Sequence, residues 1–326
     1  MLDIKVITEQ WEKDEPLYEE LGKNVSKFIR AEIPSYEILP EVSYRTKELL
    51  SIIKKIKKKL KEKDYSYNHL NDKLGLRIIC AFKDDMSKVD KFISDCFVIK
   101  KAEYKEETLN FDRLDYISNH YDLQIKTDIT SFKSLSHLRD LTFEVQVRTL
   151  NQHAWSNSAH ALTYKQEAEI IPALKRRVYR LLSLYEIADD EFSAVNSAMI
   201  NSPDNILYTI LRKLEGKIYK YAKIDYDRET SLHSIKAFLS FFEQAEQKTI
   251  LENIEEFIHS NAKKIGEIFE LNRNRFPEIP FLSQPEIFLV WYGLERHSFV
   301  IEDNWSSEFD SDDLEQIKSL WGKSID

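Results

Sequence analysis

Residues 143–149 read FEVQVRT, and this short stretch decides how the rest of the sequence is interpreted. Strict alternation of apolar and polar residues is typical of a β-strand, and it places Glu144, Gln146 and Arg148 on one face. Such a face is unusual in a core sheet, because buried charges need partners. It is therefore either exposed to solvent or functional. The helical pattern that follows favours a functional face. That pattern carries His153, Trp155, His160 and Tyr164.

The segments before this stretch predict the rest of a sheet. A buried strand is expected over 74–82 (LGLRIICAF), and the stretch 141–147 alternates cleanly as another. Further strands are expected over 98–104 and 114–125. Helices are expected over 16–33, 44–63, 84–97 and 151–165. This order of elements indicates an α/β (α+β) fold, a mixed β-sheet flanked by helices.

From about residue 167 the strand signals nearly vanish. Helix patterns follow over 170–194, 205–222, 229–244 and 249–271. The chain is accordingly expected to contain an N-terminal helical segment (1–43), a mixed domain (44–166) and an all-α accessory region (167–326). Amphipathic helices of this kind more often form a packed domain than a cofactor site. Core packing is also expected, ahead of a partner-binding patch, for Trp291, Tyr292, Trp305 and Trp321.

Composition excludes several classes of protein. With 326 residues, 42% of them hydrophobic, the chain is long enough for two packed domains. Cys80 and Cys96 are its two cysteines, which argues against a disulfide framework. No apolar run has the length of a membrane span, so a soluble, cytoplasmic protein is expected. The net charge of −9 argues against general attraction to nucleic acid, whereas the lysine run at 54–63 fits a local anion site.

A group of cations and one serine occupies the predicted helix 44–63. Ser51 and Lys55 are four residues apart and share a face, with Lys47 before them and Arg45 at the expected helix start. A helix N-terminus with arginine and lysine can hold a triphosphate. The alternative is an ordinary solvated lysine face.

Residues 72–77, DKLGLR, supply a second group at the entry of the predicted strand. A carboxylate at a strand end, such as Asp72, suits Mg²⁺ bound to substrate phosphates, because Mg²⁺ takes only one or two protein carboxylates. Gly75 allows a ligand to approach the backbone, and the guanidinium of Arg77 can stack on a purine. The alternative is a turn aspartate followed by a surface arginine.

The two acids have separable roles in this interpretation. Asp72 holds the metal, and Glu144 either shares it or acts as general base on a hydroxyl nucleophile. The sequence has no G-x-x-x-x-G-K-[ST] loop and no kinase catalytic-loop pattern, so it predicts neither a P-loop enzyme nor a protein kinase.

These motifs together resemble the synthetase domain of RelA/SpoT-type alarmone synthetases, over about residues 44–165. The R-x-K-x-x-x-S-x-x-x-K spacing starts at Arg45, and D-x-x-G-x-R starts at Asp72. The strand E-[IV]-Q-[IV]-R-T starts at Glu144. The family's trailing helix pattern corresponds to Trp155, His160, Leu162, Tyr164 and Lys165.

The resemblance implies a nucleotidyltransferase-like domain that transfers the β,γ-pyrophosphate of ATP to the 3′-hydroxyl of GDP or GTP. The product is (p)ppGpp, the signal of the stringent response, and AMP is released with Mg²⁺ as cofactor. The ATP-binding residues implied are Arg45, Lys47, Ser51, Lys55 and Arg77, the last flanking adenine with Arg45. Asp72 and Glu144 are implied as catalytic and metal-binding residues. The acceptor-binding residues implied are Tyr116, His120, Gln146 and His153.

The sequence departs from the family mainly on the acceptor side. Where the family has G-Y-R-S-x-H, residues 115–120 read DYISNH, and the basic stretch upstream has no counterpart in 106–112. Two other functions therefore stay open. One is a toxin-like pyrophosphokinase that modifies the 3′ end of tRNA, and the other is a catalytically silent nucleotide-binding regulator. The helices after residue 167 are expected to serve regulation, a protein partner or homo-oligomerisation.

Overall fold

The computed structural model describes residues 4–59, 65–104, 118–163, 172–201, 206–222 and 226–322. The chain divides into two compact units, unit 1 (1–196) and unit 2 (197–326). The change to helical composition near residue 166 precedes this division, since most of the long helix α5 (Pro172–Asn201) belongs to unit 1. The three-part domain assignment made from the sequence stays a prediction.

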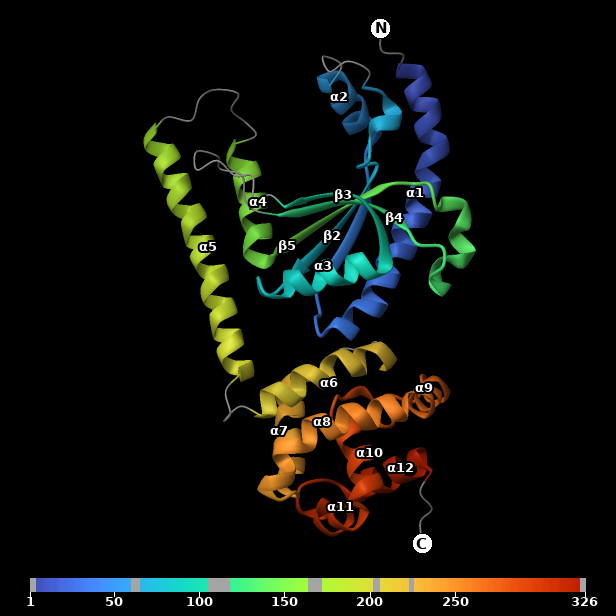
Figure 1. Ribbon diagram of the computed structural model, residues 1–326, viewed down its shortest axis with the longest axis vertical. Helices are drawn as coiled ribbons and strands as arrows, with labels where there is room; N and C mark the ends of the chain where they lie inside the picture. Colours follow the sequence, from blue (N-terminus) through green and yellow to red (C-terminus); the bar gives the residue numbers. More distant parts are fainter. Residues whose placement is uncertain are drawn as a thin grey trace. The chain divides into compact units, whose positions relative to one another are not determined.

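Unit 1 is built on a five-stranded mixed sheet in the order β1-β2-β5-β4-β3 (Figure 1). Its strands are β1 (Glu41–Thr46), β2 (Leu74–Cys80), β3 (Phe97–Tyr104), β4 (Asn119–Ile125) and β5 (Phe143–Thr149). Among the strands that the structure describes, only β2 and β5 pair in parallel, and the other neighbours are antiparallel. The predicted mixed sheet flanked by helices is confirmed.

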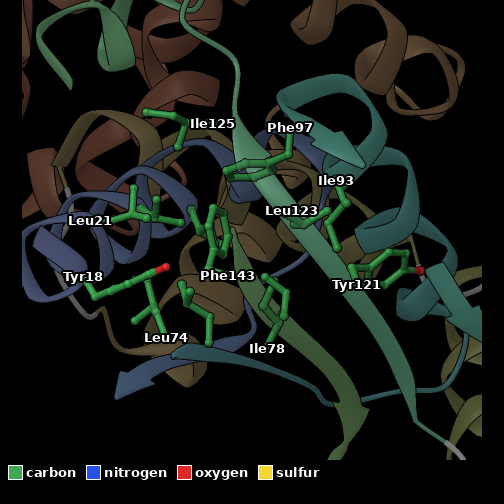
Figure 2. Packing of buried hydrophobic residues seen from close by; sticks show 14 of the residues in the cluster. Tyr18, Leu21, Leu74, Ile78, Ile93, Phe97, Tyr121, Leu123, Ile125 and Phe143 are labelled. Carbon is green, nitrogen blue, oxygen red and sulfur yellow. The ribbon is translucent and has the colours of Figure 1, made fainter. Parts of the chain in front are cut away.

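One face of the sheet is apolar and is covered by two helices. Helix α1 (Ile4–Glu32) packs on β1 and β2, and α3 (Asp85–Cys96) packs on β3 and β5. The inward positions of the strands alternate with polar ones, so that Ile78, Leu123 and Phe143 meet in one core with Leu21 of α1 (Figure 2). Burial of these side chains provides most of the stabilisation of the sheet. The opposite face is left for polar residues.

The structure corrects the predicted helix over 44–63. Residues 41–46 form strand β1, and helix α2 (Leu49–Lys59) begins only after Glu48. Pairing with β2 explains the strand, with Val42 buried on the apolar face and Ser43 at the pocket on the other. Arg45 therefore lies on the sheet and not at a helix start. Helix α1 also begins earlier than expected, since Ile7 and Trp11 continue its buried stripe.

Further helices complete unit 1 and build unit 2. Helix α4 (Leu150–Thr163) follows β5 directly and packs on β5 and β2. The helices of unit 2 are α6 (Ile206–Ala222), α7 (Arg228–Ser240), α8 (Gln244–Ser260), α9 (Ala262–Leu271), α10 (Ile287–Arg296), α11 (Ser298–Asn304) and α12 (Ser311–Trp321). The predicted helix 249–271 is two helices, which separate at Asn261. The four aromatic residues near the end of the chain are buried, so the core interpretation is confirmed for them.

Candidate active site

The polar face of the sheet gathers functional side chains in two rows across the strands. In the first row Arg45 pairs with Gly75, Gly75 with Glu144, and Glu144 with Asp122. In the second row, the backbone register aligns Ser43, Arg77, Gln146 and His120. A pocket of about 500 Å³ lies over this face. The alternation of residues 143–149 thus brings Glu144 and Gln146 to the lining of this pocket.

Asp72 stands at the entry of β2 and holds two lysines. Its Oδ2 accepts hydrogen bonds from Lys47 Nζ at 2.5 Å and Lys55 Nζ at 2.6 Å. Burial raises the pKa of the Asp72 carboxyl, but the two lysines outweigh it and hold the pKa below its ordinary value. The other oxygen, Oδ1, is buried and has no hydrogen-bond partner within the described chain. Asp72 is therefore ionised at neutral pH and keeps one oxygen available for a ligand.

Glu144 lies in a hydrogen-bonded chain of side chains. Gln146 Nε2 donates to its Oε2 at 2.7 Å, and His120 Nδ1 lies 3.4 Å from its Oε1. His120 Nε2 lies 2.7 Å from the hydroxyl of Ser118, which fixes the imidazole from the other side. Burial raises the pKa of Glu144, but the contacts with His120 and Gln146 keep it below its ordinary value. The carboxylate is thus charged and held in one orientation.

Cations crowd the remaining part of the polar face. Burial and the nearby Arg77 lower the pKa of Arg148 to about 10, although Glu144 opposes this. The pKa of Arg77 is lowered by burial and by Arg45. Burial, Arg77 and Arg148 together lower the pKa of His153. Like charges repel each other, so this arrangement favours binding of an anion that neutralises them.

Comparison with known proteins gives this constellation a family. Residues 44–169 match the family described as the region found in RelA/SpoT proteins. Residues 44–169 belong to the RelA/SpoT family. A curated relative, GTP pyrophosphokinase YjbM of Bacillus subtilis, is 25% identical over 159 residues, which are 47% of this chain and 70% of that protein. Another, GTP pyrophosphokinase YwaC of the same organism, is 22% identical over 204 residues, 60% of this chain and 94% of that protein.

Solved structures similar to the chain come from the same group of enzymes. The small alarmone synthetase 1 of Bacillus subtilis matches with a TM-score of 0.49 and 22% identity over 59% of this chain and 99% of that one. The same protein bound to its product pppGpp matches with a TM-score of 0.47 and 23% identity, over 58% and 97% of the two chains. The predicted family and enzyme class are confirmed by the family match and the curated relatives.

The structure brings together most of the residues to which the RelA/SpoT resemblance assigned roles. Around the pocket lie Arg45, Lys47, Ser51, Asp72, Arg77, Glu144 and Gln146. Lys55 joins them through Asp72, and His120 through Glu144. His153 stands near Arg77 and Arg148, with its Nε2 3.1 Å from Asn157 Nδ2. Their proximity is a structural finding, whereas the individual roles stay predictions.

Some of the predicted residues do not enter the pocket or are not described. Tyr116, Tyr164 and Lys165 lie outside the described residues, as does the side chain of His160. Trp155 is 1% exposed, and its ring lies 6.0 Å from the tilted ring of Tyr185 of α5, so Trp155 belongs to the packing of α4.

Two contributions to the site were missed from the sequence. Asp122 lies beside Glu144 in the row and accepts a hydrogen bond from Asn71 at 2.8 Å. Lys73 is only 6% exposed and lies 4.0 Å over the ring of Tyr67, which fixes the turn that carries Asp72. Alternation from Leu74 backwards could have indicated that Asp72 and Lys73 point in opposite directions. Nothing in the sequence indicated the aromatic ring that receives Lys73.

In the parts of the chain that the structure describes, there is no helix long and apolar enough to cross a membrane.

Proposed function

We propose that the chain is a pyrophosphokinase that transfers the β,γ-pyrophosphate of ATP to the 3′-hydroxyl of GDP or GTP. The observation that carries the proposal is the placement of two ionised carboxylates, Asp72 and Glu144, among crowded cations on one face of the sheet. Phosphoryl-type transfer needs mainly positioning and charge stabilisation, and this face offers both. The curated relatives carry the name GTP pyrophosphokinase, which supports the same reaction here.

The ATP half of the reaction falls to the cations on the β1–α2 side. Lys47 and Lys55 now both bind Asp72 Oδ2. The phosphates of ATP offer these ammonium groups stronger acceptors, and we expect the lysines to turn to them when ATP binds. Arg45 and Arg77 lie close enough for one to lower the pKa of the other, so a purine stacked between the two guanidinium groups would separate their charges.

The donor set fits a divalent metal of the Mg²⁺ type. The described residues contain no group of three or more histidine, cysteine or carboxylate side chains that could hold a metal alone. Mg²⁺ does not need such a cage, because it binds one or two carboxylates together with substrate phosphates. The unpartnered Oδ1 of Asp72 suits this role, with Glu144 as the second carboxylate. When bound, the metal supplies neutralisation of phosphate charge.

Glu144 is proposed to accept the proton of the attacking 3′-hydroxyl. The hydroxyl oxygen then bonds to the β-phosphorus of ATP, and the bond between that phosphorus and the oxygen bridging to the α-phosphorus breaks. AMP leaves with that oxygen and its electron pair. Because its pKa is lowered, Glu144 is ready as a base at neutral pH, and Gln146 and His120 hold its two oxygens in place. Gln146, His120 and His153, with Tyr116, are proposed to position the acceptor.

The test is to incubate the full chain with Mg²⁺ and ATP labelled at either the α- or the γ-phosphate. GDP, GTP, ATP or bulk tRNA is supplied as acceptor. We expect γ-label on GDP or GTP and α-label in AMP alone. α-Label on the acceptor would instead mean nucleotidyl transfer, and γ-label on tRNA would make the chain a tRNA-modifying enzyme. Label on no acceptor would contradict the proposal.

A further inference from the structure

Strand β5 ends with an arginine to which the proposed reaction assigns no role. Arg148 Nη2 donates a hydrogen bond to Gln146 Oε1 at 2.9 Å, and Arg148 Nη1 donates one to the hydroxyl of Ser156 on α4 at 2.7 Å. Glu144 and Gln146 line the pocket, whereas Arg148 is not among its lining residues. Arg148 therefore lies next to the pocket wall, with both terminal nitrogens bonded to side chains of the protein.

Gln146 connects Arg148 to the proposed base. Its Nε2 donates a hydrogen bond to Glu144 Oε2 at 2.7 Å, while its Oε1 accepts the one from Arg148. Residues 144, 146 and 148 alternate along one strand, so their side chains project from the same face. The result is a continuous chain of hydrogen bonds that leads from Ser156 of α4 to the Glu144 carboxylate.

The neighbours of the Gln146 amide fix its orientation. A guanidinium only donates hydrogen bonds and an ionised carboxylate only accepts them, whereas a side-chain amide has one accepting and one donating end. Between Arg148 and Glu144, the amide satisfies both neighbours in one orientation, with Oε1 toward the arginine and Nε2 toward the glutamate. Without the guanidinium, the amide oxygen loses its partner, and Nε2 can turn away from the carboxylate.

The position of Ser156 beside Arg148 is fixed by the junction of β5 and α4. The backbone N–H of Thr149 donates to Gln152 Oε1 at 2.9 Å, and the backbone N–H of Gln152 donates to Thr149 Oγ1 at 3.0 Å. Thr149 Oγ1 donates in turn to Asp189 Oδ2 at 2.7 Å, and these three residues are buried. The bonds set the direction in which α4 leaves the strand, and Ser156 follows from that direction.

We propose that Arg148 is a positioning residue for pyrophosphate transfer, because it orients the amide of Gln146 and, through this amide, the carboxylate of Glu144. The inference rests on the proposed function, in which Glu144 accepts the proton of the attacking hydroxyl. A reacting group is effective only when its own orientation is held by packing and by further hydrogen bonds. The chain from Ser156 to Glu144 provides this support from within unit 1.

The first test separates kcat from KM in the full chain. Arg148→Met should lower kcat for transfer by about 10–100-fold, because Glu144 then loses its fixed orientation. The KM for ATP should change by less than about twofold, since the proposed ATP-binding lysines lie on the β1–α2 side. The matched control is Arg139→Met, which removes a cation that is 65% exposed and should keep both constants. An unchanged kcat in Arg148→Met would overturn the proposal.

A double-mutant cycle tests whether Arg148 acts through Gln146. In a Gln146→Leu background the amide is absent, so Arg148→Met should cause no further fall in kcat. Equal falls in both backgrounds would overturn the proposal, because Arg148 would then act by another route. Ser156→Ala removes only the anchor of the guanidinium and should lower kcat by about fivefold. Circular dichroism shows whether each variant is folded, and Ser156→Ala carries the test if Arg148→Met is not.

The orientation of Gln146 can also be measured without catalysis. In the ¹⁵N-labelled full chain, the side-chain amide signal of Gln146 is the one that Gln146→Leu removes. We expect its protons to exchange slowly with water in the wild type and in Arg139→Met, and faster in Arg148→Met. Equal exchange in all three would overturn the inference. If exchange becomes faster in Arg148→Met while the wild type transfers pyrophosphate to no acceptor, the orientation of Gln146 by Arg148 stands and the proposed function is wrong.

Discussion

Buried charges are present in both units, but the two units arrange them differently. In unit 2 opposite charges meet: Glu215 is 4% exposed and lies 3.2 Å from Arg228, and Lys318 lies 3.6 Å from Glu302. In unit 1 Asp72 has two cationic partners, Lys47 and Lys55, but Arg77 and Arg148 lie close enough together that Arg77 lowers the pKa of Arg148. Removing one partner of a buried pair leaves an uncompensated charge and destabilises the fold, whereas like charges held close together fit a site that a ligand completes.

The same contrast holds between the two faces of the sheet. The apolar face is covered by α1 and α3, and its side chains are nearly inaccessible. The polar face is built from alternate residues of the same strands, so a pocket and a core share one backbone. Changes on the polar face are therefore expected to alter activity, and changes in the core or in unit 2 to alter stability.

Replacing Asp72 with Asn should have the largest effect on transfer. The substitution keeps the shape of the side chain but removes the charge that holds Lys47 and Lys55 and that is proposed to bind the metal. We expect the rate of pyrophosphate transfer to fall by about 10²–10³-fold. Steady-state kinetics with labelled ATP measures the loss, and Glu144→Gln should behave alike.

The matched control for this prediction is Asp90→Asn. Asp90 is also a partly buried carboxylate of unit 1, but it accepts a hydrogen bond from Tyr121 at 2.5 Å on the apolar face. This variant should keep its activity per folded molecule, because Asp90 lies outside the pocket. Full activity in Asp72→Asn and Glu144→Gln would remove both proposed roles.

Replacing Glu215 with Gln in unit 2 should lower stability and leave the rate of pyrophosphate transfer unchanged, the reverse of what is expected for Asp72→Asn. The neutral side chain weakens the contacts with Arg228 and with the Tyr226 hydroxyl, which now donates a hydrogen bond to it. We expect unit 2 to lose about 1–3 kcal/mol of unfolding free energy. Urea unfolding followed by tryptophan fluorescence measures this loss. A large fall in transfer rate without a loss of stability would show that unit 2 takes part in catalysis.

The sequence predicted a strand correctly where the residues of that strand alone had a clear pattern of alternation or of continuous apolar residues. The alternation of residues 143–149 identified β5 and its polar face, and the apolar run at 74–82 identified β2. The same reasoning failed for β1, because Leu49, Ile52 and Ile56 gave the whole segment 44–63 a helical pattern. Only pairing with β2, a contact distant in sequence, extends residues 41–46 as a strand.

The candidate site was predictable as a set of residues but not as a network. Motif spacing predicted that Asp72, Lys47 and Lys55 belong to one site. It could not show that a single carboxylate oxygen of Asp72 accepts hydrogen bonds from both lysines. Asp122 carried no motif, and its place beside Glu144 depends on the register of β4 against β5. Register between strands far apart in sequence is set by the folded sheet as a whole.

Two glycines, Gly75 in unit 1 and Gly293 in unit 2, differ in the space that surrounds them. A Cβ at Gly75 would have no heavy atom within 4 Å, whereas one at Gly293 would lie 2.8 Å from Phe238 and 2.9 Å from Ile301. Gly75→Ala should therefore leave stability unchanged, but its methyl group would occupy pocket space and raise the KM for ATP by about tenfold. Gly293→Ala should leave the KM unchanged and cost about 1–3 kcal/mol of stability through overpacking.

Titration of these two variants against ATP, with urea unfolding of each, tests the pair. An unchanged KM in Gly75→Ala would mean that ATP does not approach this backbone. Destabilisation of Gly75→Ala would mean that the glycine is needed by the fold itself.

The smallest expected effect is a difference in the response of the two units to pH. In unit 1 the pKa values of Asp72 and Glu144 are lowered in the folded state. Their contribution to stability is present above their ordinary pKa values and is lost as the pH falls through the lowered ones. In unit 2, burial raises the pKa of Glu286, which is 2% exposed, above its ordinary value of 4.5.

The pH dependence of the stability contributed by Glu286 is therefore opposite to that of Asp72 and Glu144. The folded state keeps its proton while the unfolded chain has lost it, so the contribution of Glu286 is present below pH 4.5 and is lost as the pH rises through its raised pKa. Replacing Glu286 with Gln removes this titration, and the stability of unit 2 should then fall less between acidic and neutral pH than in the wild type. Trp291, Trp305 and Trp321 are buried in unit 2, whereas Trp11 and Trp155 are buried in unit 1. In a background with Trp11→Phe and Trp155→Phe, the fluorescence change on urea unfolding at each pH therefore reports on unit 2. Identical pH profiles for the two proteins would mean that Glu286 is ionised in the folded state, and that its buried carboxylate is balanced by a partner as Glu215 is.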